Sequence, residues 1–193
     1  MSIWINSARW LILFAALSGC EMGTGTATSR AAPVLGGAVQ VGVPPGFCIN
    51  GGASRETANG AVILMGRCTD AVQVKPALIS VSIGPAGSAG VMTAGGPALA
   101  GYFTSAEGRA TLSRNGRGKD IRVIEALGVG DAFLLHLQDR GVGDYWRAVV
   151  GVKGRLVTLS TTGTADVPLD PKDGRQLLDK ALSALRSANA GGG

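Results

Sequence analysis

The side chains of this sequence that are most able to do chemistry are its three thiols, Cys20, Cys48 and Cys68. A thiol can pair with another thiol, ligate a metal or accept a covalent group. No C-x-x-C pair is present, and the residues around Cys48 and Cys68 lack the spacing of metal ligands. If two of the thiols pair, the third is left over, so the setting of each cysteine decides its chemistry.

Cys20 directly follows a segment with the pattern of an export signal. Arg9 is the only charged residue before it, and residues 10–17 are all apolar. A positive start, a short apolar stretch and a small-residue exit are typical of a secretory signal. A spanning helix needs roughly 18 or more apolar residues in succession, and Asn6, Ser7 and Arg9 interrupt any longer count. The sequence therefore predicts a signal peptide over residues 1–19.

The exit of this segment, Leu17, Ser18, Gly19 and Cys20, resembles the lipobox of bacterial lipoproteins. The resemblance implies that Cys20 becomes the acylated first residue of the mature chain, and several acyl chains on one residue give stable membrane anchoring. Glu21, in place of an Asp that would retain the protein at the inner membrane, slightly favours the outer membrane. We therefore expect a lipid-anchored protein on the periplasmic side of the cell envelope. An ordinary cleaved signal or a buried cysteine is the alternative.

If lipid occupies Cys20, Cys48 and Cys68 are free to pair in an oxidising compartment. Their disulfide would close the glycine-rich segment 51–60 as a loop and stabilise the fold by roughly 3 kcal/mol in the chain-entropy model. A redox-active pair is the alternative interpretation.

Composition indicates one loop-rich domain that contains β-structure. The chain has 193 residues with 31 glycines, and only 16% of its residues are charged, which is untypical of a helical bundle. We expect a signal peptide over residues 1–19, the lipidated Cys20 with a flexible tether over 20–37, and a glycine tail over 191–193. A single α+β domain fills residues 38–190.

Hydrophobic periodicity predicts the elements of that domain. Early strands are expected at 39–43, 61–67 and 77–83, a surface loop at 86–96, and a short helix at 97–113. Hairpin-length, glycine-containing connectors separate four later strands, at 120–127, 131–139, 145–152 and 155–162.

A terminal amphipathic helix follows Asp170 and Pro171, which suit a cap and a first helical turn. The predicted fold class is therefore α+β, with an antiparallel meander packed against the C-terminal helix and the shorter helix. Along the third meander strand, one face is better suited to a core than the other.

Two resemblances rest on these motifs. The order of expected elements resembles that of the PsbP-like α/β/α sandwich: strand, Pro-Pro-Gly-Phe turn at 44–47, strand, short helix, meander and closing helix. Residues 154–160 are similar to the last strand of that fold. That resemblance implies a non-catalytic accessory or assembly protein. The pattern Gly46, Phe47, Cys48, Ile49 with Cys68 resembles small uncharacterised Gram-negative lipoproteins, some labelled cation-transport ATPases. That activity needs an Asp-Lys-Thr-Gly site and a membrane domain, and this sequence contains neither.

Catalytic patterns are absent from the sequence. His136 is the only histidine, which cannot build a histidine metal cluster, and no Gly-x-Ser-x-Gly motif supplies a nucleophile. Residues 115–120 lack the glycine spacing and the Ser or Thr of a phosphate-binding loop. We therefore expect no enzyme, no cofactor and no metal.

One charged segment exceeds the background. Five cations and the single acid Asp120 give residues 109–122 a net charge of +4. The cations are Arg109, Arg114, Arg117, Lys119 and Arg122. A solvated surface is one interpretation, and contact with anionic headgroups, lipopolysaccharide phosphate or an acidic partner protein is the other. Nucleic acid is not expected for an exported lipoprotein. The predicted function is a non-catalytic accessory or binding module, with a carrier of a small apolar ligand or lipid as the alternative.

Overall fold

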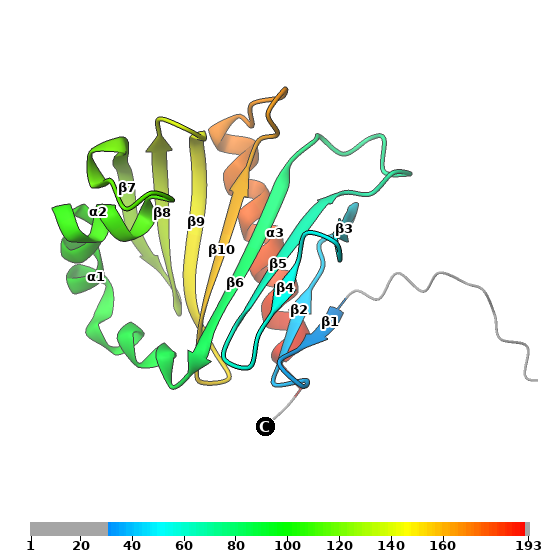
Figure 1. Cartoon of the computed structure of the whole chain (residues 1–193), viewed down its shortest axis with the longest axis horizontal. Coiled ribbons are helices and arrows are strands. Elements are labelled where there is room, and N and C mark those ends of the chain that lie inside the picture. Colours follow the sequence, from blue (N-terminus) through cyan, green and yellow to red (C-terminus); the bar gives the residue numbers. More distant parts are fainter. Residues whose placement is uncertain (1–30, 192–193) are drawn as a thin grey trace, which may run out of the picture.

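An antiparallel β-sheet forms the centre of the computed structural model, which describes residues 31–191 (Figure 1). The predicted signal peptide, Cys20, the first part of the tether and the last two glycines lie outside the described residues. The strands are β1 (Ala31–Val34), β2 (Val39–Gly42), β3 (Phe47–Ile49), β4 (Arg55–Glu56), β5 (Ala61–Arg67), β6 (Leu78–Ala86), β7 (Ile121–Val129), β8 (Ala132–Asp139), β9 (Gly143–Val152) and β10 (Arg155–Thr162). The helices are η1 (Ser88–Ala94), α1 (Gly95–Thr104), α2 (Ala106–Leu112), η2 (Gly118–Asp120) and α3 (Pro171–Asn189).

The strands of the large sheet follow the order β3-β5-β6-β10-β9-β8-β7, and β4 also pairs with β5. The predicted α+β class and the four-stranded meander β7 to β10 are confirmed. Gly130 and Gly154 take positive φ angles of 62° and 74° in two of its turns, a conformation that glycine adopts without a steric penalty. After β6 the chain crosses through the helices to the far edge of the sheet, so the returning β10 pairs antiparallel with β6.

Both faces of the sheet are covered. α3 and the separate β1–β2 ribbon pack on one face, while η1, α1 and α2 lie on the other (Figure 1). In β9, Trp146 and Val150 enter the larger core below α3, and Tyr145 and Val149 enter the smaller core below α1 and α2. The sequence pattern predicts that one face of this strand is the core face, and the structure corrects that expectation. Alternate residues of β9 serve two separate cores.

α3 closes the larger core. Its side chains that recur at helical spacing are buried: Leu178, Ala181, Leu182 and Leu185. The predicted start of the helix is confirmed, because Asp170 Oδ1 accepts a hydrogen bond from the Lys172 N–H at 2.8 Å. Burial of each large aliphatic side chain contributes about 1.5–3 kcal/mol, which makes this helix a principal source of stability.

The far end of α3 is bound to the β1–β2 ribbon. Asn189 donates from Nδ2 to the Gln40 carbonyl at 2.7 Å and accepts the Gln40 N–H through Oδ1 at 3.0 Å. A Cβ on Gly42 would lie 2.0 Å from the Ala184 carbonyl oxygen, so only glycine permits this approach of strand and helix. The first strands and the last helix therefore form one structural unit.

β1 corrects the predicted tether. Residues 31–34 lie within the segment 20–37 that we expected to be flexible, yet they pair with β2 and bury Val34 to 4% exposure. The segment forms a strand although it has no alternating apolar pattern. Backbone hydrogen bonds and one inserted valine are enough to fix a strand of four residues. Ordered structure therefore begins no later than Ala31.

The helical region also differs from expectation. η1 replaces the predicted loop at 86–96, and two helices replace the single helix predicted at 97–113. The break falls at Ser105, which is extended and accepts the Gly108 N–H through its hydroxyl at 3.0 Å. A Cβ at Gly108 would lie 2.0 Å from the Tyr102 carbonyl oxygen, so glycine allows α2 to fold tightly against α1.

The predicted disulfide between Cys48 and Cys68 is confirmed. Cys48 lies in β3, and Cys68 immediately follows β5, which pairs with β3. The Cys68 N–H also donates to the Gly46 carbonyl at 3.0 Å. The bridge therefore fastens the short edge strand β3 to its neighbour.

We expect the double substitution Cys48→Ser and Cys68→Ser to lower the free energy of unfolding by about 3 kcal/mol, because the bridge constrains the unfolded chain. The bridge spans a sequence separation of 20 residues. Urea denaturation of the full chain, followed by circular dichroism, measures the change. Wild-type protein in reductant is the control and must show the same loss. A change below about 1 kcal/mol would contradict the proposed role of the bridge.

Candidate ligand-binding site

The structure divides the predicted basic segment between two hollows. Arg109, Lys119 and Arg122 line the first, of about 330 Å³, and no acid is among its described lining residues. The Arg109 guanidinium donates to the Thr104 carbonyl, which fixes it at the end of α1. These three cations, which share a hollow whose described lining holds no acid, are named the basic hollow.

Arg114 and Arg117 line the second hollow with Arg140, Asp120 and Asp139. Arg117 Nε donates to Asp120 Oδ2 at 2.7 Å, and this bond lowers the pKa of the Asp120 carboxyl below its ordinary value of 3.8. The stabilisation from this pair is therefore present above pH 3.8 and is lost as the pH falls through the lowered pKa. Arg117 is therefore paired with an acid, and Arg114 lies in a different hollow from the other three cations, so the predicted five-residue cluster is reduced to three.

His136, the sequence's only histidine, lies among packing contacts. Its ring stacks on Trp146 with centroids 4.7 Å apart and planes 7° from parallel. Its side chain is 13% exposed, Nε2 is buried without a hydrogen-bond partner in the described chain, and Asp144 Oδ2 lies 3.9 Å away. Trp146 Nε1 donates to the Pro171 carbonyl at 2.8 Å. Through Trp146, His136 is therefore packed against the start of α3, and none of these contacts is with a nucleophile.

A third hollow lies between the sheet and the helices of the smaller core. η1 is held against β10 by Ser88, whose hydroxyl accepts the Leu156 N–H at 2.8 Å and donates to the Pro85 carbonyl at 2.6 Å. The end of α1 is held on β8 by Phe103, which stacks on Phe133 at 5.8 Å between centroids. The helices are thus fixed to the sheet at two places and leave a pocket between them.

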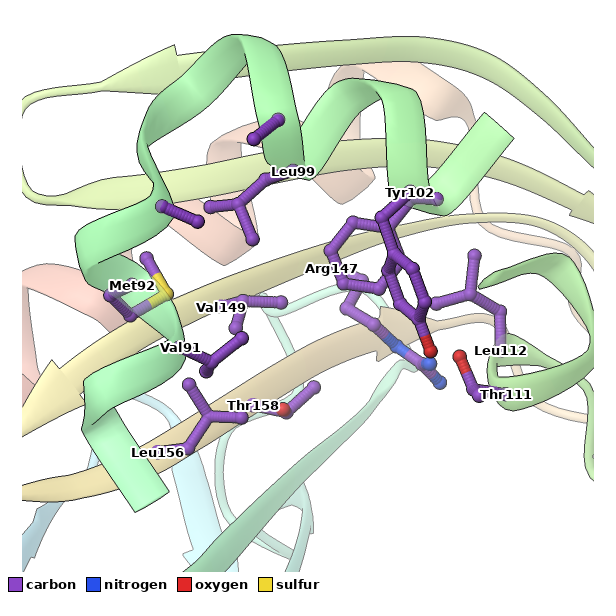
Figure 2. A pocket seen from close by; sticks show the side chains of 13 residues that line it. Val91, Met92, Leu99, Tyr102, Thr111, Leu112, Arg147, Val149, Leu156 and Thr158 are labelled. Atoms are coloured by element: carbon purple, nitrogen blue, oxygen red, sulfur yellow. The ribbon is translucent and has the colours of Figure 1, made fainter. Parts of the chain in front are cut away.

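This pocket measures about 520 Å³, within the range of about 300–1,000 Å³ typical of small-molecule sites. Most of its lining is apolar and comes from η1, α1, α2, β9 and β10 (Figure 2). The lining residues are Val91, Met92, Ala94, Ala98, Leu99, Tyr102, Phe103, Thr111, Leu112, Arg147, Val149, Leu156 and Thr158. Val91 and Tyr102 remain 48% and 43% exposed, so apolar surface at this pocket is open to solvent.

Arg147 is the only charged residue among those lining side chains. Its Nε donates to Ser160 Oγ at 3.0 Å, and its guanidinium carbon lies 5.5 Å from the centre of the Tyr145 ring. Burial raises the pKa of the Tyr145 phenol. No carboxylate of residues 31–191 forms an ion pair with Arg147. The described chain therefore gives this half-buried cation a hydroxyl and an aromatic ring as partners, but no anion.

Sequence reasoning did not select Arg147 as a site residue. The available signal was its position between Trp146 and Ala148 in an apolar strand, on the same face as Tyr145 and Val149. An arginine on a strand face that helices cover is a candidate binding residue. The cover over that face was not visible in the sequence, because part of it was predicted as a loop.

Metal chemistry has no candidate centre between residues 31 and 191, where no group of three or more His, Cys, Asp or Glu side chains could hold an ion. Over the same range, no helix is long and apolar enough to cross a membrane. Comparisons with protein families, with curated proteins and with solved structures find no match to this chain. The fold and the site together define an α+β domain with a pocket of small-molecule size between the sheet and the helices.

Proposed function

We propose that this protein is a lipid-anchored, non-catalytic binding module of the bacterial cell envelope that carries a small apolar or amphipathic molecule. The apolar pocket below η1 and α1 is the observation that carries this proposal. Its volume and lining suit a small molecule, and surface left exposed there would be buried by a ligand. The resemblance to PsbP-like accessory proteins supports a role in binding rather than in catalysis.

The lipobox at residues 17–20 supports attachment to the membrane through acyl chains on Cys20, on the periplasmic side. Glu21 favours the outer membrane. The disulfide between Cys48 and Cys68 suits the same oxidising compartment.

Cys20→Ser is expected to move the protein from the membrane fraction to the soluble fraction, because the acyl chains then have no attachment site. Fractionation and mass spectrometry of the N-terminal peptide measure location and acylation. The variant with Cys48→Ser and Cys68→Ser is the matched control, since it keeps Cys20 and should stay with the membrane. An unacylated wild-type Cys20 would refute the anchor.

Occupancy of the pocket is tested by detergent-free purification of the full chain, followed by mass spectrometry of non-covalently bound molecules. We expect wild-type protein to carry an apolar or amphipathic ligand, and Ala98→Trp to carry less than about one tenth as much, because an indole would fill the space. Ala98 lines the pocket and is exposed, so the substitution leaves the buried core intact.

Ala165→Trp, in the exposed connection before α3, is the matched control for the added indole and should retain wild-type occupancy. Equal ligand content in the Ala98→Trp protein, or none in the wild type, would contradict the carrier function.

The basic hollow supports a second contact, with anionic lipid headgroups. We expect Lys119→Glu with Arg122→Glu, made in the unacylated Cys20→Ser protein, to weaken binding to phosphatidylglycerol vesicles by more than about tenfold, since each cation near such a surface contributes about 1 kcal/mol. Co-sedimentation measures the binding.

The matched control for charge is Lys172→Glu with Lys180→Glu, on exposed positions of α3. Vesicle binding that falls equally in both double variants would indicate a general charge effect. Unchanged binding in the first variant would remove the headgroup contact.

A further inference from the structure

The chemistry of the pocket is uneven along its length. Val91, Met92, Leu99 and Leu156 make one end mainly apolar, with the Thr158 side chain beside Leu156 (Figure 2). In the same view, the Arg147 guanidinium and the hydroxyls of Tyr102 and Thr111 gather at the other end (Figure 2). A molecule that matches both ends has an apolar chain and a polar head.

The hydrogen-bond donors at the polar end determine which charge of the ligand's head group is favoured. A guanidinium has five N–H donors, and only Nε of Arg147 donates to a residue of the described chain, namely Ser160. The two terminal NH₂ groups are left to bind a ligand. The Thr111 hydroxyl already donates to the Gly108 carbonyl at 2.7 Å, so it can only accept. The available donors of Arg147 suit an acidic oxyanion, which a guanidinium binds through two parallel hydrogen bonds.

The surroundings hold Arg147 in place for this task. Ser160, only 6% exposed, fixes the Nε side of the guanidinium, and the Tyr145 ring lies 5.5 Å from its central carbon. Ser160 and Arg147 are direct cross-strand partners in β10 and β9, so backbone pairing sets their spacing. The charge is therefore positioned before a ligand arrives, which reduces the entropy lost on binding.

We propose that the ligand is an amphiphile with one acidic oxyanion head, a carboxylate or a phosphate monoester, bound by Arg147, and an acyl or alkyl chain in the apolar end. This inference rests on the proposed carrier function and specifies its ligand class. Arg147 acts as the specificity-determining residue, since the rest of the lining accepts any apolar chain of suitable length. A neutral or cationic amphiphile leaves the guanidinium without its partner.

The experiment is calorimetric titration of the full chain, freed of bound lipid, with probes of one chain length, the charged ones below their micelle concentrations and the alcohol below its solubility limit. The probes are dodecanoate, dodecyl phosphate, dodecanol and dodecyltrimethylammonium. We expect dodecanoate or dodecyl phosphate to bind at least about tenfold more tightly than dodecanol, as a charge-assisted bidentate pair should provide. The stronger of the two anions identifies the head group. Dodecyltrimethylammonium should bind more weakly than dodecanol.

Arg147→Met should abolish the preference for the anion and leave the affinity for dodecanol within about threefold of wild type, because the apolar lining is retained. Arg147→Lys should retain part of the preference, since it keeps the charge but not the planar fork. Thermal unfolding of both variants verifies that they are folded, and Ala98→Trp provides a blocked pocket.

Equal binding of dodecanoate, dodecyl phosphate and dodecanol to wild type would overturn the head-group inference while leaving an apolar carrier intact. An anion preference that survives Arg147→Met would overturn the assignment to Arg147. If wild type binds none of the probes, or if Ala98→Trp binds them equally well, the pocket is not the carrier site and both proposals fail together.

Discussion

A sheet whose central strands are apolar on both faces must be covered on both faces, and the rest of this structure depends on that constraint. β8 and β9 bury side chains toward both sides, with Leu134 and Leu135 fully buried on opposite faces. The long helix α3 and the β1–β2 ribbon close one side. Short helices cover the other side in pieces, fixed to the sheet near Ser88 and Phe103. The pocket lies between these helices and the sheet.

Charge placement separates the two sides in the same way. The side chains around α3 form mutual contacts, as in the ion pair of Arg175 with Asp179 and the contact of Arg175 with the Trp146 ring at 5.0 Å. On the other side, Arg147 points into the pocket, and no acid is among the described residues that line the basic hollow. A cation with a structural role uses its hydrogen-bond donors within the protein, whereas Arg147 and the cations of the basic hollow retain donors for a ligand. Both proposed binding sites therefore lie on the side that the short helices cover.

Much of the fold was predictable, because its signals are local. Glycine-containing turns delimit the meander, and Asp170 with Pro171 marks the start of α3. The errors arose where tertiary contacts override weak local patterns. β1 exists because β2 and the core accept Val34, and the break at Ser105 exists because Gly108 lets two helices touch. Of the basic segment, Arg117 proved to be neutralised by Asp120, and Arg147 became recognisable only once helices were seen above it. Pocket residues came from five separate elements, which no local pattern could bring together.

The union of the first strands with the last helix has a consequence for biogenesis. Gln40 and Asn189, which bond to each other, are 149 positions apart, and Gly42 packs against the backbone of Ala184 in the last helix. Contacts between such distant positions require closure of a very long loop, which slows folding. A nascent chain cannot complete its main core until almost all of its residues have been made. Such late closure keeps the polypeptide unfolded for longer, and an unfolded chain is the form that a protein-conducting channel can thread.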